Sequence, residues 1–167
     1  MCTSERNRAL VHSFFQWCEA SAIHDAIAGS LWAFAVIESV HLLGLAAIGG
    51  AVLVVDMRML GFGLRRQPIA DVARNAYPWL VGSVIVMIAT GALLFLSEPM
   101  KCYGSNPFWV KMTSLAFAIV FTFTIRRSVT QADESRMPPI FYKLVAIVSL
   151  GLWFSVGAAG RWIGFSG

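Results

Sequence analysis

Residues 31–55 read LWAFAVIESVHLLGLAAIGGAVLVV, a run that contains a single acidic residue and a single histidine. About 20 apolar residues are enough for a helix to cross the roughly 30 Å hydrocarbon core of a bilayer. Lipid offers no hydrogen bonds to the backbone, so a helix is the expected form. Three further apolar runs cover roughly residues 78–97, 108–125 and 140–162. The sequence therefore predicts an all-α integral membrane protein, a bundle of four transmembrane helices.

The composition agrees with a lipid environment. The chain has 167 residues, of which 57% are hydrophobic and 13% are charged, and its mean hydropathy is +0.69. A soluble domain carries about 25% charged residues, so lipid rather than water is the expected solvent for much of the surface. The net charge of +4 is no sign of nucleic-acid binding, because excess Lys and Arg in membrane proteins commonly sets orientation.

Basic residues are unevenly distributed over the predicted loops. The first and third loops hold most of them, and the middle loop holds only Lys101 and Lys111. The residues of the two basic loops are Arg58, Arg65, Arg66, Arg74, Arg126, Arg127, Arg136 and Lys143. By the positive-inside rule, these two loops face the cytoplasm, and both termini are predicted to be periplasmic.

The first 30 residues differ from the rest. They mix apolar side chains such as Phe15 and Trp17 with charged ones such as Arg8 and Glu19, and they lack the pattern of a signal peptide. We interpret residues 1–30 as an amphipathic segment on the outer membrane surface, and residues 31–167 as the transmembrane domain.

His41 is the most informative position. It lies ten residues into the first run, roughly 15 Å along the helix, and Glu38 is one turn away on the same face. An ionisable residue at such depth is costly and suggests function. Three interpretations remain open: a neutral histidine that holds helices together, a cofactor or metal ligand, and a proton relay with Glu38.

A b-type haem is the obvious cofactor for a ligating His41, because four-helix bundles hold haem between facing helices. His24, 17 residues before His41, would lie about 25 Å away along a continuous helix, and it could share the iron only if the chain folds back. Met87, near the middle of the second run, is the candidate second axial ligand, although ordinary lipid-facing or core packing is the favoured interpretation of this residue. Lys111 and Arg161 form a candidate cationic rim for propionates or lipid phosphates, or simply extend to the interface.

Other metal sites lack support. Glu38 and His41 match half of a di-iron helix, but the second and third runs contain no carboxylate to complete it. The cysteines Cys2, Cys18 and Cys102 form no C-x-x-C pair, and whether any two of them form a disulfide stays open.

Small residues are frequent in the first and fourth runs, as in Gly44, Gly49, Gly157 and Gly160. Such residues allow helices to approach closely, so these two runs are expected inside the bundle and the third run against lipid.

Several motifs carry a family resemblance. They are Glu38-Ser-Val-His41-Leu-Leu-Gly44, Asp56-Met-Arg58-Met-Leu-Gly61, Pro78-Trp79, Thr90-Gly91, Phe108-Trp109-Val-Lys111 and Gly160-Arg161-Trp-Ile-Gly164-Phe. The chain from about Trp17 onward resembles an uncharacterised family of small bacterial four-helix inner-membrane proteins. The histidine helix is also similar to copper-resistance membrane proteins and b-type cytochrome bundles. The resemblance implies the bacterial inner membrane and carries no activity.

We therefore expect a membrane subunit, rather than an independent enzyme, that binds one b-type haem through His41 and serves redox or anchoring in a larger complex or homo-oligomer. The first alternative is a proton- or cation-handling transport subunit that uses Glu38 and His41. The second is a purely structural or assembly protein.

Overall fold

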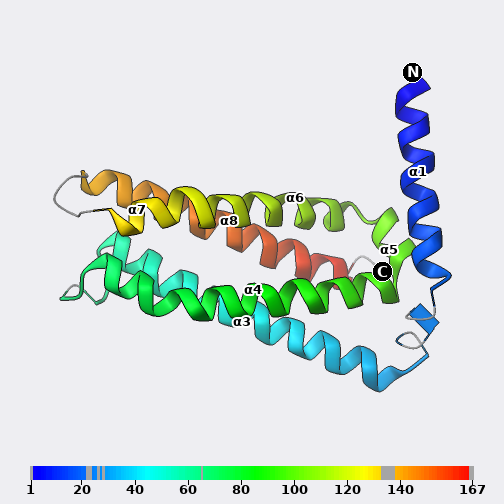
Figure 1. The fold of residues 1–167 in the computed structure, drawn as a ribbon, viewed down its shortest axis with the longest axis horizontal. Helices are drawn as coiled ribbons and strands as arrows, with labels where there is room; N and C mark the ends of the chain where they lie inside the picture. Colours follow the sequence, from blue (N-terminus) through cyan, green and yellow to red (C-terminus); the bar gives the residue numbers. More distant parts are fainter. Residues whose placement is uncertain are drawn as a thin grey trace.

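The computed structural model describes residues 2–21, 24, 25, 27, 29–64, 66–132 and 138–165. Its long helices are α3 (Leu31–Leu60), α4 (Ile69–Ser97), α6 (Asn106–Phe121) and α8 (Pro139–Phe165), and they run side by side (Figure 1). A π-helix, η1 (Thr122–Arg126), and α7 (Arg127–Gln131) continue α6. The remaining elements are α1 (Cys2–Glu19) and α5 (Pro99–Gly104).

Four stretches are long and apolar enough to cross a membrane: Trp32–Leu60, Ile69–Ser97, Asn106–Gln131 and Pro139–Ile163. The predicted four-helix membrane bundle is confirmed. The chain is a multi-pass membrane protein whose apolar helices are suited to a lipid bilayer.

Local sequence explains where α3 begins and ends. The Ser30 hydroxyl accepts a hydrogen bond from the Ala33 N–H and caps the first turn. The last turn closes at Gly61, whose φ of 87° is a left-handed conformation that glycine adopts without strain. The helix thus extends five residues beyond the apolar run that ends at Val55.

The second span begins earlier than predicted. Helix α4 starts at Ile69, so Pro78 lies inside the helix rather than in front of it. Transmembrane helices tolerate an internal proline where neighbouring helices and side chains compensate for the missing backbone hydrogen bond.

Neighbouring helices pack in the order α4, α3, α8, α6, and α7, which continues the α6 segment, contacts α4. Ala118 is the single buried residue within α6, so the third run is the most exposed of the four spans, as the prediction of a lipid-facing helix requires. Gly44 lies at the contact between α3 and α4, where a Cβ would be in ordinary van der Waals contact, 3.6 Å from the Met87 nitrogen and the Ser83 oxygen. At Gly49 and Gly157 a Cβ would meet nothing within 4 Å, so a contact role for these two is wrong.

Two buried clusters form the core. The first joins α3, α4, α6 and α8 through Ile48, Val52, Leu80, Val84, Met87, Ala118, Trp153 and Val156. The second lies toward the predicted cytoplasmic end and comprises Val55, Met59, Ile69, Val72, Val129, Tyr142, Val145 and Ala146.

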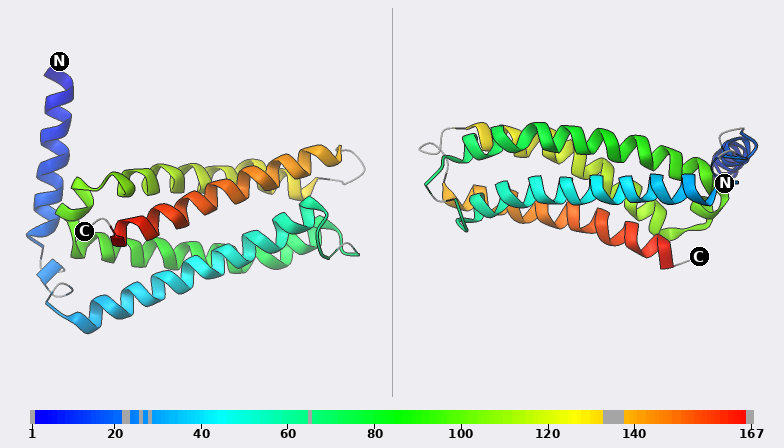
Figure 2. Two further views of the ribbon diagram at one scale, coloured as in Figure 1. Left: turned by 180° about the vertical axis from the view of Figure 1, so that it is seen from behind. Right: turned by 90° about the horizontal axis from the view of Figure 1, so that it is seen from below.

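Helix α1 lies crosswise at the opposite end of the bundle, beside α5 (Figures 1 and 2). Its Phe15 side chain is buried edge-on against Phe95 of α4 and Tyr103 of α5. Phe14 and Trp17 on the same helix are exposed. This arrangement suits a helix that lies in the membrane interface.

Candidate functional site

A cavity of about 450 Å³ lies between α4 and α6, near the end of the bundle that α1 covers. His41 of α3 contributes to its lining, and Phe15 of α1 closes it on the outer side. The other lining residues are Met87, Ile88, Gly91, Ala92 and Phe95 of α4, and Phe108, Trp109, Lys111, Met112 and Leu115 of α6. Ile88 and Met112 are about half exposed, so the cavity reaches the lipid-facing surface. Its volume is typical of small-molecule sites.

His41 is 7% exposed and is held by α4. Its Nδ1 lies 2.9 Å from the Thr90 Oγ1, and that hydroxyl donates its single hydrogen to the Val86 carbonyl at 2.7 Å. The Thr90 oxygen must therefore accept, which makes Nδ1 the protonated nitrogen of His41. The lone pair of the ring then lies on Nε2.

Lys111 faces that lone pair. Its Nζ lies 3.4 Å from the His41 Nε2, a long hydrogen bond in which the ammonium donates. The lysine stem runs across α8, because a Cβ at Gly160 would lie 3.5 Å from Nζ. An ammonium has three N–H donors, so two remain for a ligand in the cavity.

Glycine at position 91 gives the imidazole its space. A Cβ there would lie 3.2 Å from the His41 Cε1, closer than ordinary van der Waals contact.

We expect Gly91→Ala to displace the imidazole and to lower the melting temperature. Gly82→Ala, on the same helix with nothing within 4 Å, should leave it unchanged or raise it, since alanine favours helix. Thermal unfolding in detergent, compared between the two variants, measures the difference. Equal melting temperatures would contradict this tight packing.

The structure brings together three of the five predicted site residues. His41, Met87 and Lys111 line the same cavity. Glu38 is exposed, and no hydrogen bond or ion pair of the described residues joins it to His41. Arg161 is exposed in the last turns of α8 and does not line this cavity.

The site lies nearer the α1 end of the bundle than its middle. Thr90 is seven residues, roughly 10 Å, from the end of α4, and Lys111 is five residues, roughly 8 Å, from the start of α6. The predicted position of His41 near the centre of the bilayer stays a prediction.

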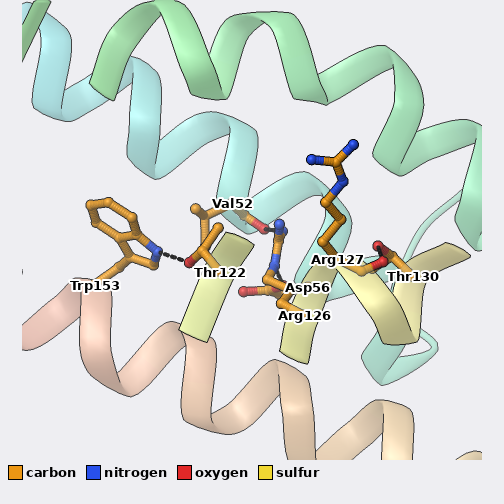
Figure 3. A network of polar contacts seen from close by, with 7 residues as sticks. All are labelled: Val52, Asp56, Thr122, Arg126, Arg127, Thr130 and Trp153. Atoms are coloured by element: carbon orange, nitrogen blue, oxygen red, sulfur yellow. Dashed lines mark hydrogen bonds and ion pairs between the residues drawn. The ribbon is translucent and has the colours of Figure 1, made fainter. Parts of the chain in front are cut away.

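A second polar cluster lies toward the other end of the bundle (Figure 3). The Arg126 Nε donates to the Asp56 Oδ1 at 2.9 Å, and the two side chains are 6% and 0% exposed. The Arg126 Nη2 also donates to the Val52 carbonyl at 3.4 Å. The Ser149 hydroxyl lies beside the same carboxylate but outside hydrogen-bond geometry.

Sequence reasoning missed this ion pair. Asp56 and Arg58 both lie at the end of the first run, a spacing that predicts a local ion pair or a headgroup contact, whereas the Arg58 Nε donates to the Gln67 carbonyl. The available signal was an acidic and a basic residue at the same ends of the first and third runs. Such residues inside membrane segments usually face a partner within the bundle.

The π-helix lies beside this ion pair. The Arg127 N–H donates to the Thr122 carbonyl, five residues back, which widens the helix by one residue. Thr122 accepts a hydrogen bond from the Trp153 Nε1 at 3.1 Å, and this explains a tryptophan deep inside the fourth run (Figure 3). Arg126 and Arg127 point to different sides, the first to α3 and the second toward α4.

The two cysteines whose side chains are described form no disulfide. Cys18 and Cys102 are both free, and Cys2 lies outside the described side chains. Burial raises the pKa of the Cys102 thiol, and the Glu98 carboxylate adds to that rise. Among the described residues, no three His, Cys, Asp or Glu side chains come together to hold a metal ion.

Fold and site define a class: a four-helix, multi-pass membrane protein with an apolar cavity whose polar end is a histidine–lysine pair. The chain belongs to the family of unknown function DUF6644, whose family model matches residues 14–166. This confirms the predicted membership in an uncharacterised family. Neither the curated proteins nor the solved structures gave a match.

Proposed function

We propose that this protein is a membrane subunit that binds a lipophilic ligand with an oxygen-bearing ring, of the quinone or phenol type, in the cavity beside His41. The observation that carries the proposal is the juxtaposition of the His41 Nε2 with the Lys111 Nζ, 3.4 Å apart, at the polar end of an apolar cavity.

The two polar groups complement such an oxygen. A ring carbonyl accepts from an N–H of the Lys111 ammonium that is not used by His41, and a ring hydroxyl can accept from the same ammonium. The hydroxyl would donate to the His41 lone pair only by taking the place that the ammonium holds there. The quinone and hydroquinone forms of one ligand therefore both find a partner.

The remaining walls suit the rest of such a ligand. Phe95, Phe108 and Trp109 offer aromatic faces for a ring, and the exposed Ile88 and Met112 mark an opening toward lipid. A ligand dissolved in the bilayer can enter between α4 and α6 without passing through water.

A b-type haem is the second candidate. It is favoured by the Nδ1–H of His41, which leaves Nε2 available as a ligand with a fixed ring orientation, and by Met87 on the same cavity. These residues fit haem only in part, because the Lys111 ammonium already donates a hydrogen bond to the His41 Nε2 lone pair, which the iron would need. The proton-relay alternative has less support, since Glu38 is exposed and away from the cavity.

A titration tests ligand binding directly. We expect a short-tailed benzoquinone to quench the tryptophan fluorescence of the detergent-purified protein in a saturable manner, because Trp109 lines the cavity. The saturable part should disappear in Trp109→Phe and persist in Trp79→Phe, whose exposed tryptophan lies elsewhere on α4. Purely linear quenching, identical in both variants, would show partitioning into the micelle and would exclude the site.

We also propose that the protein resides in a bacterial inner membrane with both termini in the periplasm. The support is the basic character of the loops at the other end of the bundle. A C-terminal alkaline phosphatase fusion should be active and a C-terminal green fluorescent protein fusion dark. The reverse result would invert the topology and place the His41 cavity on the cytoplasmic side.

A further inference from the structure

A second cavity, of about 360 Å³, lies between α4 and the η1–α7 segment at the opposite end of the bundle. Ala70 in the first turn of α4 and Gln131 at the end of α7 border it, so it lies at the boundary of the membrane spans. Its apolar lining consists of Ala51, Val55, Ala73, Ala76, Leu80 and Phe123. The apolar part continues inward, toward the level where acyl chains lie.

Among the described residues, the polar side chains that line the cavity are neutral or cationic. They include Arg74, Arg126 and Arg127 together with Tyr77 and Thr130, and none of the described lining residues is acidic. Arg126 is already paired with Asp56. Arg74 is 3.8 Å from Asp71, an exposed and loose contact that leaves its charge largely available.

Contacts with Tyr77 hold the Arg127 guanidinium in place and leave N–H donors for an anion. Its guanidinium carbon lies 4.9 Å from the centre of the Tyr77 ring, and its Nη1 donates to the Tyr77 hydroxyl at 3.1 Å. Stacking and this hydrogen bond fix the plane of the guanidinium but use only one of its five N–H donors. A fixed guanidinium binds phosphate oxygens in pairs, with less entropy lost than for a free side chain.

From this geometry we propose that the cavity binds the phosphate group of an anionic phospholipid, with Arg127 and Arg74 on the phosphate and an acyl chain along the apolar lining. Basic pockets between transmembrane helices on the cytoplasmic side commonly hold anionic headgroups. This site is separate from the His41 cavity in lining and chemistry, so either can fail without the other.

Native mass spectrometry of the protein released from delipidated micelles tests the proposal, with phosphatidylglycerol and phosphatidylcholine as probes. One phosphatidylglycerol should bind per chain with at least tenfold preference. Arg127→Gln should lower that affinity about tenfold or more, Arg74→Gln less, and Tyr77→Phe should have an intermediate effect. The matched control is Arg66→Gln, an exposed arginine at the same end that does not line the cavity, and it should bind as the native protein does.

Three outcomes overturn the proposal. Equal affinities for phosphatidylglycerol and phosphatidylcholine would show that the net charge of the lipid does not determine binding. An equal loss in Arg66→Gln and Arg127→Gln would replace the site by general surface attraction. If millimolar inorganic phosphate displaces the lipid, and the affinity does not depend on acyl-chain length, the arginines bind a soluble anion rather than a lipid.

Discussion

Replacing Arg126 with methionine is expected to destabilise the bundle by about 3–5 kcal/mol, the cost of leaving a buried charge without its partner. The Asp56 carboxylate has no exposed surface, and among the described residues the Arg126 guanidinium is its only bonded partner. Asp56→Leu should have an effect of the same order, because the guanidinium is then left in an apolar environment. Unfolding in mixed micelles with increasing dodecyl sulfate measures both values.

The double variant Asp56→Leu/Arg126→Met separates charge from packing. Replacing a buried ion pair by apolar side chains of similar volume is often neutral or stabilising, so the double variant should recover most of the lost stability. Arg127→Met is the neighbouring control: its exposed side chain contacts Tyr77, and a loss below about 1 kcal/mol is expected. Losses that simply add in the double variant would show that the two charges do not depend on each other.

Replacing Lys111 with methionine should change the affinities for the two candidate ligands in opposite directions. A hydrogen bond to a charged group contributes about 1.5–3 kcal/mol, so quinone affinity should fall about tenfold or more. The same change removes the cation from the His41 lone pair, so haem should bind more readily. His41→Ala should weaken both.

Quinone quenching and the visible spectrum before and after dithionite give the two readouts on the same samples. Lys101→Met, an exposed lysine of α5 outside the cavity, is the control and should change neither. A Soret band that is present in the native protein, survives in Lys111→Met and disappears in His41→Ala would favour the haem candidate. Quinone affinity equal in Lys111→Met and native protein would contradict the leading proposal.

The sequence predicts some residues of the site but not the full set. An ionisable residue inside an apolar run is costly in lipid and therefore indicates a functional position, which is why the sequence predicts His41 and Lys111. Glu38 was predicted for the same reason, but its place on α3 leaves it exposed. Helical spacing shows which residues share a face and does not show which face the next helix covers. Thr90 and Gly91, which orient and accommodate the imidazole, carry no sequence signal of that role.

The sequence by itself determined that this chain is a bundle of four membrane-spanning helices, because the length and apolarity of each run leave the backbone no other arrangement in lipid. Only the tertiary structure decided the packing order, with α4 facing α6 across one cavity and facing the η1–α7 segment across the other. It also decided the pairing of Asp56 with Arg126, 70 residues away. The physical reason is that lipid drives every apolar helix into the membrane equally, whereas helix partners are selected by close packing and buried polar contacts, which depend on three-dimensional fit.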